Sequence, residues 1–311
     1  MASKRSLSRL YEIIPFHDAL LADRVRNRAF HRALRARIRP STTVLDIGSG
    51  TGLWAIAAAR LGARRVVAVE KEPWLAPLIE RLARDNGVAD RVEVVPGDSR
   101  RIRLRRRFDL IVSETVGNEA FDEGMLAILA DARRRFLRAG GSVIPQAVAL
   151  VAAPVHAPAL APRERRLPIG TACFDALALH FPRGPGLRPL RRLGPGVELV
   201  RVELASSLAP TTLGELRGRW RVRDLGPVNA FALWVQMTLA PGIRLSTLSG
   251  THWAPTLLGV EPLGSGPGTL ALRLHLSPRG SRWEVEVTTR GLARTLQYSG
   301  LFAYGSLRAR R

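Results

Sequence analysis

The stretch VLDIGSGTGLWAIAAARLG, residues 44–62, decides the fold. It opens with an apolar run typical of a buried strand and ends in alanine- and leucine-rich sequence typical of a helix. Between them stand Gly48, Gly50 and Gly52, which let the main chain adopt unusual torsions and approach a ligand closely. The stretch is therefore predicted to form a strand, a tight turn and a helix, the first unit of an α/β fold.

Strand and helix signals alternate around this unit. Helical periodicity over residues 8–38 ends before Pro40, because proline interrupts a helix. Beyond the unit, strands are predicted at 65–70, 91–98 and 108–114, and helices at 73–87 and 122–139. This alternation predicts a Rossmann-like parallel sheet with helices on both faces.

The pattern changes after Pro145. Proline and glycine become more frequent, and strands are predicted at 197–204, 229–239, 271–276 and 282–287, the last two joined by the hairpin signal SPRGS. Residues 156–195, rich in Pro and Arg, fit neither pattern. We expect an N-terminal helical lid at 1–39, a cofactor-binding α/β domain at 40–145 and an antiparallel β-barrel domain at 146–311.

The formal net charge of +22 comes from 46 Arg and two Lys against 26 acidic residues. A basic balance favours nucleic acid or anionic membranes as partners. Here the charge is spread along the chain, and the densest run, 100–108, contains one aromatic residue, which argues against nucleic acid. The sequence contains no run of 18 apolar residues, so no membrane span is predicted, and we see no signal peptide. With the single cysteine, Cys173, these features predict a cytoplasmic enzyme without a thiolate metal site.

Three acidic residues lie at or near the ends of predicted strands, at one edge of the sheet. Asp46 precedes the glycines in a DxGxGxG pattern, which favours S-adenosylmethionine over the dinucleotides that bind GxGxxG loops. Glu70, 24 residues later, suits paired hydrogen bonds to the ribose hydroxyls, and Asp98 suits the adenine amino group. For Glu70 and Asp98 the alternative is that an acidic residue simply ends its strand in solvent.

Two glutamates, Glu114 and Glu123, lie nine residues apart. Glu114 ends a predicted strand, and Glu123 lies in the first turn of the predicted helix 122–139, where a carboxylate is favourable on its own. Two carboxylates that face one pocket repel each other unless a cation lies between them. A guanidinium is a suitable cation, because it is planar and binds carboxylates in a bidentate manner.

The stretch SETVGNEAFDEGML, residues 113–126, resembles the double-glutamate loop of the protein arginine methyltransferase family. Residues 251–253 read THW and match the family's THW loop. The family's YxxxxxHxxxLxDxxR segment is matched by Tyr11, His17, Leu21, Asp23 and Arg26. Because three separated motifs agree, the resemblance extends over nearly the whole chain.

The resemblance implies specific roles for these residues. Residues implied to bind S-adenosylmethionine are Asp46, Gly48, Gly50 and Glu70, with Arg26 pairing its carboxylate. Glu114 and Glu123 would hold the acceptor guanidinium, and Trp253 would form a wall of the substrate pocket. His252 would bond Asp23 and tie the barrel to the N-terminal helices. The family carries its dimerisation arm at the place of 156–195, which implies a homodimer.

The implied reaction is methyl transfer to the guanidino group of arginine in a protein or peptide. Thr115, Val116 and Asn118 stand where the family has Trp, Met and Tyr, so the acceptor stays open between a specific peptide and a small guanidino compound. A chain of charge +22 does not suit Arg-rich, histone-like tails. Two alternatives are a methyltransferase of this fold with another acceptor and a nucleic-acid-binding or RNA-modifying protein.

Overall fold

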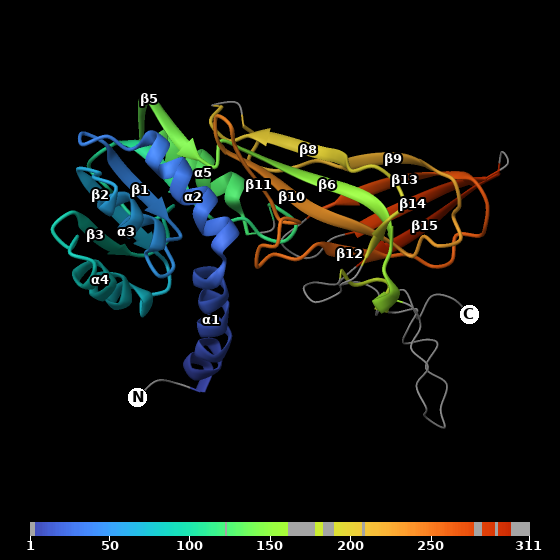
Figure 1. Ribbon diagram of the computed structural model, residues 1–311, viewed down its shortest axis with the longest axis horizontal. Coiled ribbons are helices and arrows are strands. Elements are labelled where there is room, and N and C mark those ends of the chain that lie inside the picture. The colour runs from blue at the N-terminus through green and yellow to red at the C-terminus, as the bar shows by residue number, and fades with distance from the viewer. Residues whose placement is uncertain are drawn as a thin grey trace.

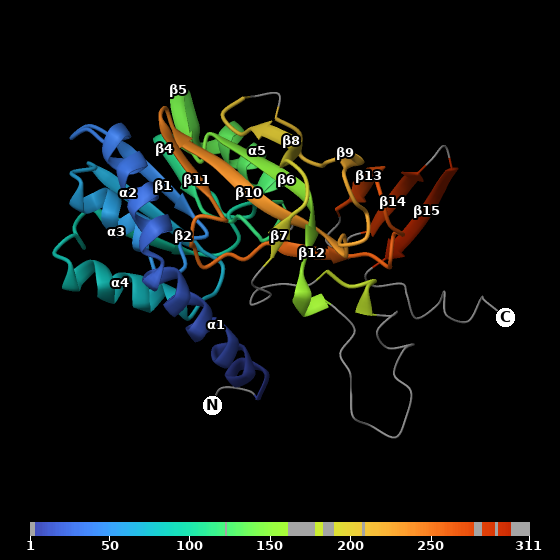
Figure 2. The same ribbon diagram turned by 45° about the vertical axis from the view of Figure 1, so that its right-hand side comes forward.

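The computed structural model describes residues 4–121, 123–160, 178–182, 190–206, 209–276, 282–289 and 292–299. Figure 1 shows a parallel sheet with its helices at one end and antiparallel sheets at the other. Figure 2 shows from a second side that helix α1 (Lys4–Ala22) extends away from the parallel sheet toward the N-terminus. Most of the predicted dimerisation arm, 156–195, lies outside the described residues.

The first sheet has five parallel strands in the order β3-β2-β1-β4-β5. Their bounds are β1 (Thr43–Ile47), β2 (Arg65–Glu70), β3 (Val92–Pro96), β4 (Phe108–Ser113) and β5 (Leu137–Ile144). Strands β1, β2 and β4 are buried along nearly their whole length, as expected for strands covered on both faces. The predicted Rossmann-like sheet is confirmed.

Helices α2 (Arg24–Arg37), α3 (Leu53–Arg60), α4 (Leu75–Asp85) and α5 (Met125–Phe136) accompany this sheet. The segment predicted to be helical over 8–38 is helical, and it is divided into α1 and α2 by a break at Asp23 that was not predicted. Asp23 leaves the helical conformation, with ψ at 85°, and accepts a hydrogen bond from the main-chain N–H of Arg26. An aspartate cap of this kind starts a new helix.

The helix predicted over 122–139 was too long. Gly124 has a φ of 79°, in the left-handed region that favours glycine, and α5 begins after it at Met125. Glu123 therefore precedes the helix rather than lying in its first turn. At the other end, residues from Leu137 onward pair with β4 as strand β5.

The second half forms two antiparallel sheets, which confirms its predicted class. One contains β11-β10-β6-β7, with β12 beside β10 and β8 beside β6, and the other has the order β15-β14-β13-β9. The strands of the first are β6 (Ala147–His156), β7 (Arg191–Arg192), β8 (Val197–Glu203), β10 (Ala230–Ala240), β11 (Ile243–Ser246) and β12 (Thr256–Gly259). Those of the second are β9 (Leu216–Val222), β13 (Gly268–His275), β14 (Arg282–Thr289) and β15 (Leu292–Ser299), and a short 3-10 turn, η1 (Pro158–Leu160), follows β6.

Helix α2 lies between the two halves of the molecule. It contacts α3 and also β10 and β11. Its buried residues, among them Phe30 and Leu34, belong to a hydrophobic core that is continuous from the parallel sheet into the antiparallel sheets. Within the described ranges, no helix combines the length and apolar character needed to cross a bilayer.

Candidate active site

The glycine turn after β1 is packed on several sides. The main-chain N–H of Gly48 donates to the carbonyl of Val69, which joins the turn to β2. Gly50 has a φ of 56°, and a Cβ added there would lie 2.8 Å from Cε1 of His17 on α1. A side chain at position 50 would thus be both strained and in collision with the ring. The turn is a narrow cradle that only glycine permits.

Glu70 and Asp46 lie beside this cradle, and both are buried. Glu70, at the end of β2, accepts from the main-chain N–H of Gly50 at 2.7 Å and from that of Glu72 at 2.9 Å. Oδ2 of Asp46 accepts from the main-chain N–H of Ala55 at 3.0 Å. Oδ1 of Asp46 has no hydrogen-bond partner among the described residues.

The electrostatics of Asp46 are unusual for a carboxyl group. Burial, reinforced by the nearby carboxylates of Glu70 and Glu114, raises the pKa of Asp46 to about 7. A buried acceptor without a partner is costly unless a ligand or water satisfies it. The open Oδ1 and the cradle at Gly50 therefore fit a polar, cationic cofactor such as S-adenosylmethionine.

Asp98 lies on the same edge of the sheet but is engaged by a neighbour. Its carboxylate accepts from the main-chain N–H of Arg100 and pairs with the guanidinium of that residue at 3.0 Å. These hydrogen bonds from Arg100 lower the pKa of Asp98. Asp98 is partly exposed, in contrast to Asp46 and Glu70.

Asp23 and His252, 229 positions apart, are in direct contact. Oδ2 of Asp23 accepts from the main-chain N–H of His252 at 2.7 Å and lies 2.8 Å from Nδ1 of its ring. Burial would raise the pKa of Asp23, but the hydrogen bonds from His252 and Arg26 outweigh it and lower that pKa. The predicted contact between the THW loop and the N-terminal helices is present.

Arg26 pairs with Glu114. Nε of Arg26 donates to Oε2 of Glu114 at 3.1 Å, and Nη2 bonds the same oxygen. Both side chains are buried, with 4% and 7% of their surface exposed. Burial raises the pKa of Glu114, while Arg26 and His252 act in the opposite direction. Arg26, predicted as a cofactor residue, therefore also contacts a predicted substrate residue.

Trp253 joins the THW loop to the double-glutamate loop. Its indole Nε1–H donates to the carbonyl of Val116 at 3.0 Å, and its ring packs against that of His252 at 4.1 Å. Val116 is two residues from Glu114. The two predicted substrate loops, far apart in sequence, thus meet.

The two predicted clamp carboxylates have different environments. Glu114, at the end of β4, is buried, whereas Glu123 is exposed in the turn before α5. Thr115 also contributes, since a Cβ at Gly48 would lie 2.9 Å from its Cγ2. The start of the double-glutamate loop is therefore packed directly on the cofactor cradle.

The structure adds neighbours that the sequence did not predict. His17 was noted only as part of a motif, yet its ring covers Gly50. Burial is the main cause that lowers the pKa of His17. Asn27 accepts from Nη1 of Arg26 at 2.8 Å and donates to the carbonyls of Leu20 and Leu21. Only its position next to Arg26 could have indicated Asn27.

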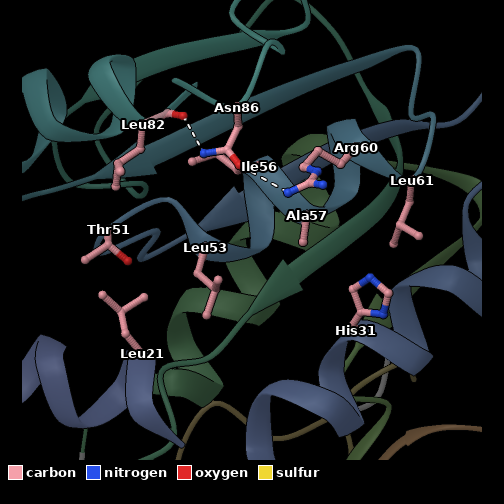
Figure 3. A pocket seen from close by; sticks show the side chains of 10 residues that line it. All are labelled: Leu21, His31, Thr51, Leu53, Ile56, Ala57, Arg60, Leu61, Leu82 and Asn86. Carbon is pink, nitrogen blue, oxygen red and sulfur yellow. Dashed lines mark hydrogen bonds between the residues drawn. The ribbon is translucent and has the colours of Figure 1, made fainter. Parts of the chain in front are cut away.

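A separate pocket of about 540 Å³ lies between the helices (Figure 3). It is lined by Leu21, His31, Thr51, Leu53, Ile56, Ala57, Arg60, Leu61, Leu82 and Asn86. Figure 3 shows apolar side chains from α1, α3 and α4 around it, with Arg60 bonded to Asn86 at its rim. None of the residues predicted to bind the cofactor or the acceptor lines it, although Thr51 of the glycine turn does.

Comparison with known proteins identifies the family. Residues 44–141 match the family model described as Methyltransferase domain. Over 278 residues the chain is 33% identical to the Arginine N(omega)-methyltransferase of Streptomyces achromogenes subsp. streptozoticus, covering 84% of this chain and 76% of that protein. The chain belongs to the protein arginine N-methyltransferase family. This family member is an arginine N-methyltransferase that uses S-adenosylmethionine.

Other relatives agree over similar lengths. Protein arginine N-methyltransferase 6 of Xenopus laevis is 27% identical over 281 residues, covering 81% of this arginine methyltransferase and 79% of that protein. Among solved structures, the Trypanosoma brucei PRMT1 enzyme-prozyme complex with AdoHcy has a TM-score of 0.74 at 20% identity, covering 91% of this chain and 97% of that one. Arabidopsis thaliana protein arginine methyltransferase 10 has the same TM-score at 21% identity, with 91% and 96% covered. These likenesses show the fold.

Proposed function

We propose that Glu114 and Glu123 hold the guanidinium of arginine beside the methyl donor. The observation that carries this proposal is the position of Glu114, buried at the end of β4 and followed by Thr115, which contacts the glycine cradle. Arg26 bonds Oε2 of this carboxylate, and a carboxylate has further acceptor sites that suit a second cationic partner. Glu123, in the exposed turn, would approach the same guanidinium from the side of the solvent.

The cofactor site proposed here consists of Asp46, Gly48, Gly50, Glu70 and Asp98, with Arg26. Arg26 makes four side-chain hydrogen bonds within the described part of the chain, whereas a guanidinium has five N–H donors. One Nη2–H therefore can pair with the carboxylate of the cofactor while Arg26 remains on Glu114. Glu70 and Asp46 offer acceptors for its hydroxyl and cationic groups.

The protein's contribution to the reaction is alignment and charge. S-adenosylmethionine supplies an activated methyl group on a sulfonium. Glu114 and Glu123 orient the acceptor nitrogen for in-line attack and draw the positive charge of the guanidinium toward its other nitrogens. After transfer the guanidinium loses a proton, and His252, held by Asp23, is the proposed acceptor of that proton.

Two acceptor classes are open, and we favour free arginine or another small guanidino compound over a protein. The net charge of +22 repels Arg-rich polypeptide tails. The relative from Streptomyces, which aligns over 84% of this chain, carries the name arginine methyltransferase without reference to a protein. An arginine-containing peptide is the second candidate, because the Xenopus relative is named for protein arginine.

The test measures methyl transfer from radiolabelled S-adenosylmethionine to free arginine and to a panel of Arg-containing peptides. Glu114→Gln and Glu123→Gln should each lower kcat by about 100-fold or more, the loss typical for one preorganised electrostatic contact. Glu80→Gln, on the exposed side of α4, is the matched control. Cofactor affinity is measured separately by calorimetry.

The outcomes separate the two parts of the proposal. Activity on free arginine with none on the peptides supports the small-molecule acceptor, and the reverse assigns the peptide. If both glutamine variants methylate arginine like the wild type, the guanidinium clamp is refuted. A wild-type enzyme that binds cofactor but methylates neither free arginine nor any of the peptides would also contradict it.

We also propose a homodimer, from the resemblance and from one surface feature. Among the described residues, helices α1, α2 and α4 carry five exposed large apolar side chains, namely Ile14, Phe16, Leu21, Val25 and Leu78. Leu21 also lines the pocket of Figure 3. An apolar surface of this kind typically marks contact with another protein. A cytoplasmic location and the division at 39/40 and 145/146 remain our proposals as well.

A further inference from the structure

Three aromatic rings from separate elements surround the guanidinium of Arg26. Cζ of Arg26 lies 5.0 Å from the ring centroid of Trp54 on α3. It lies 5.9 Å from the rings of Phe30 on α2 and Trp253 of the THW loop. Phe30 and Trp54 stack on each other at 4.8 Å and 19°. All three distances are within the range of a cation–π contact.

The rings are buried, so their position is determined by packing. Phe30 is fully buried, and Trp54 and Trp253 are each 4% exposed. The interior makes the contact with a cation stronger than at the surface. A buried guanidinium also needs its donors satisfied, and Glu114, Leu20 and Asn27 accept from it. The arrangement leaves Arg26 little freedom to leave Glu114.

Trp54 is not among the residues predicted to bind the cofactor or the acceptor. It is the second residue of α3, directly after the glycine turn, and its ring is the nearest of the three to Arg26. The neighbouring Leu53 lines the separate pocket instead. Trp54 therefore connects the cofactor turn to the Arg26–Glu114 pair by packing alone.

We propose that Trp54 is a positioning residue for methyl transfer, because with Phe30 and Trp253 it holds Arg26 on Oε2 of Glu114. Arg26 then favours the ionised form of the buried Glu114 carboxyl, against the effect of burial, and orients it for the acceptor. The part of this inference that concerns the acceptor rests on the proposed guanidinium clamp. The part that concerns Arg26 and Glu114 stands on the observed contacts alone.

Other charged groups face Glu114 and affect the test. His252, from the THW loop, lowers the pKa of Glu114 together with Arg26. Asp46, on β1, interacts with Glu114, and its own pKa of about 7 places its titration near neutrality. The pH dependence of activity would therefore reflect the titration of both carboxyl groups, Asp46 and Glu114. Direct observation of the Glu114 carboxyl group is therefore the better test of the effect of Trp54.

The experiment follows the side-chain carboxyl of Glu114 by NMR on enzyme labelled with ¹³C at glutamate Cδ, the signal being assigned from Glu114→Gln. Trp54→Leu removes the ring, and Trp54→Phe keeps an aromatic face. In Trp54→Leu the Glu114 titration should move to higher pH, because a less restrained Arg26 stabilises the carboxylate less. The value of kcat/KM for arginine near neutral pH should fall about 5- to 30-fold. Trp54→Phe should stay close to wild type in both measurements.

The outcomes distinguish this inference from the proposed function. A Glu114 titration unchanged in Trp54→Leu, or shifted equally in Trp54→Phe, overturns the role of Trp54. If Glu114→Gln retains arginine methylation, the clamp fails, but the titration still decides whether Trp54 acts on Glu114. Thermal melts show whether each variant folds. If Trp54→Leu does not fold, Trp54→Met takes its place as the non-aromatic variant.

Discussion

Replacing Asp23 tests how the N-terminal helices are attached to the rest of the molecule. The carboxylate of Asp23 accepts three hydrogen bonds, one from the main-chain N–H of Arg26 and two from His252. Asp23→Ala removes all three. Asp23→Asn keeps an oxygen that can cap α2 but loses the charge and presents an amide donor to the donors of His252.

The expected cost follows from these bonds. Loss of a helix cap costs about 1 kcal/mol of unfolding free energy. Each hydrogen bond between His252 and the charged, buried carboxylate contributes at least about 1.5 kcal/mol. We therefore expect Asp23→Asn to lose about 3 kcal/mol and Asp23→Ala about 4 kcal/mol. A loss of 3 kcal/mol should lower Tm by about 6 to 12 °C in a chain of this size class.

The assay is chemical and thermal unfolding of wild type and both variants, followed by circular dichroism from pH 7 to pH 3. The pKa of Asp23 is lowered in the folded protein from its ordinary value of 3.8. The difference in unfolding free energy between wild type and Asp23→Asn should therefore be complete above about pH 4. It should decline as the pH falls through the folded pKa of Asp23. A difference below about 0.5 kcal/mol, or one that does not change at low pH, would refute this account of the contact.

The other predictions concern the cradle, the loops and the surface. Gly50→Ala should weaken cofactor binding at least about 10-fold by calorimetry, because its Cβ would lie 2.8 Å from His17; unchanged affinity would contradict the cradle. Trp253→Phe removes the bond to Val116 and should lower kcat about 5-fold with cofactor affinity unchanged; equal kcat would show that the bond does not matter. Since the folded pKa of Asp46 is raised to about 7, unfolding free energy should fall as pH rises from about 4 to 7, and Asp46→Asn should remove that slope. Leu78→Arg, on the exposed apolar surface, should convert a dimer to a monomer in light scattering, and a wild-type monomer would refute the proposed dimer.

The parallel sheet could be predicted because its strands are buried on both faces. Such strands appear as continuous apolar runs, as in residues 65–70, where the predicted and observed bounds agree. The helix break at Asp23 was missed because apolar periodicity continues across it. Its signal was the aspartate itself, a favoured cap residue. Strand β5 was missed because Gly140 and Gly141 have low strand propensity, and pairing with β4 overrides it.

The contacts of the site were predictable only where motifs marked both partners. His252 and Asp23 belong to two recognisable motifs, and their contact is observed. The aromatic enclosure of Arg26 could not be predicted, since Phe30, Trp54 and Trp253 come from three elements with no fixed spacing. Trp253 bonds the main-chain carbonyl of Val116, which every residue type has, so the identity of Val116 could not indicate this bond. Such contacts depend on tertiary packing, which side-chain patterns do not encode.

The contact between Asp23 and His252 also has a consequence for protein synthesis. The two residues are 229 positions apart, so Asp23 is translated long before His252 and cannot form this contact in the interval. At about 5 to 20 residues per second, this interval is about 10 to 50 seconds. Throughout it, Asp23 lacks its two hydrogen bonds with His252. A nascent chain arrested before the THW loop is consequently expected to lack this attachment of the N-terminal helices to the rest of the molecule.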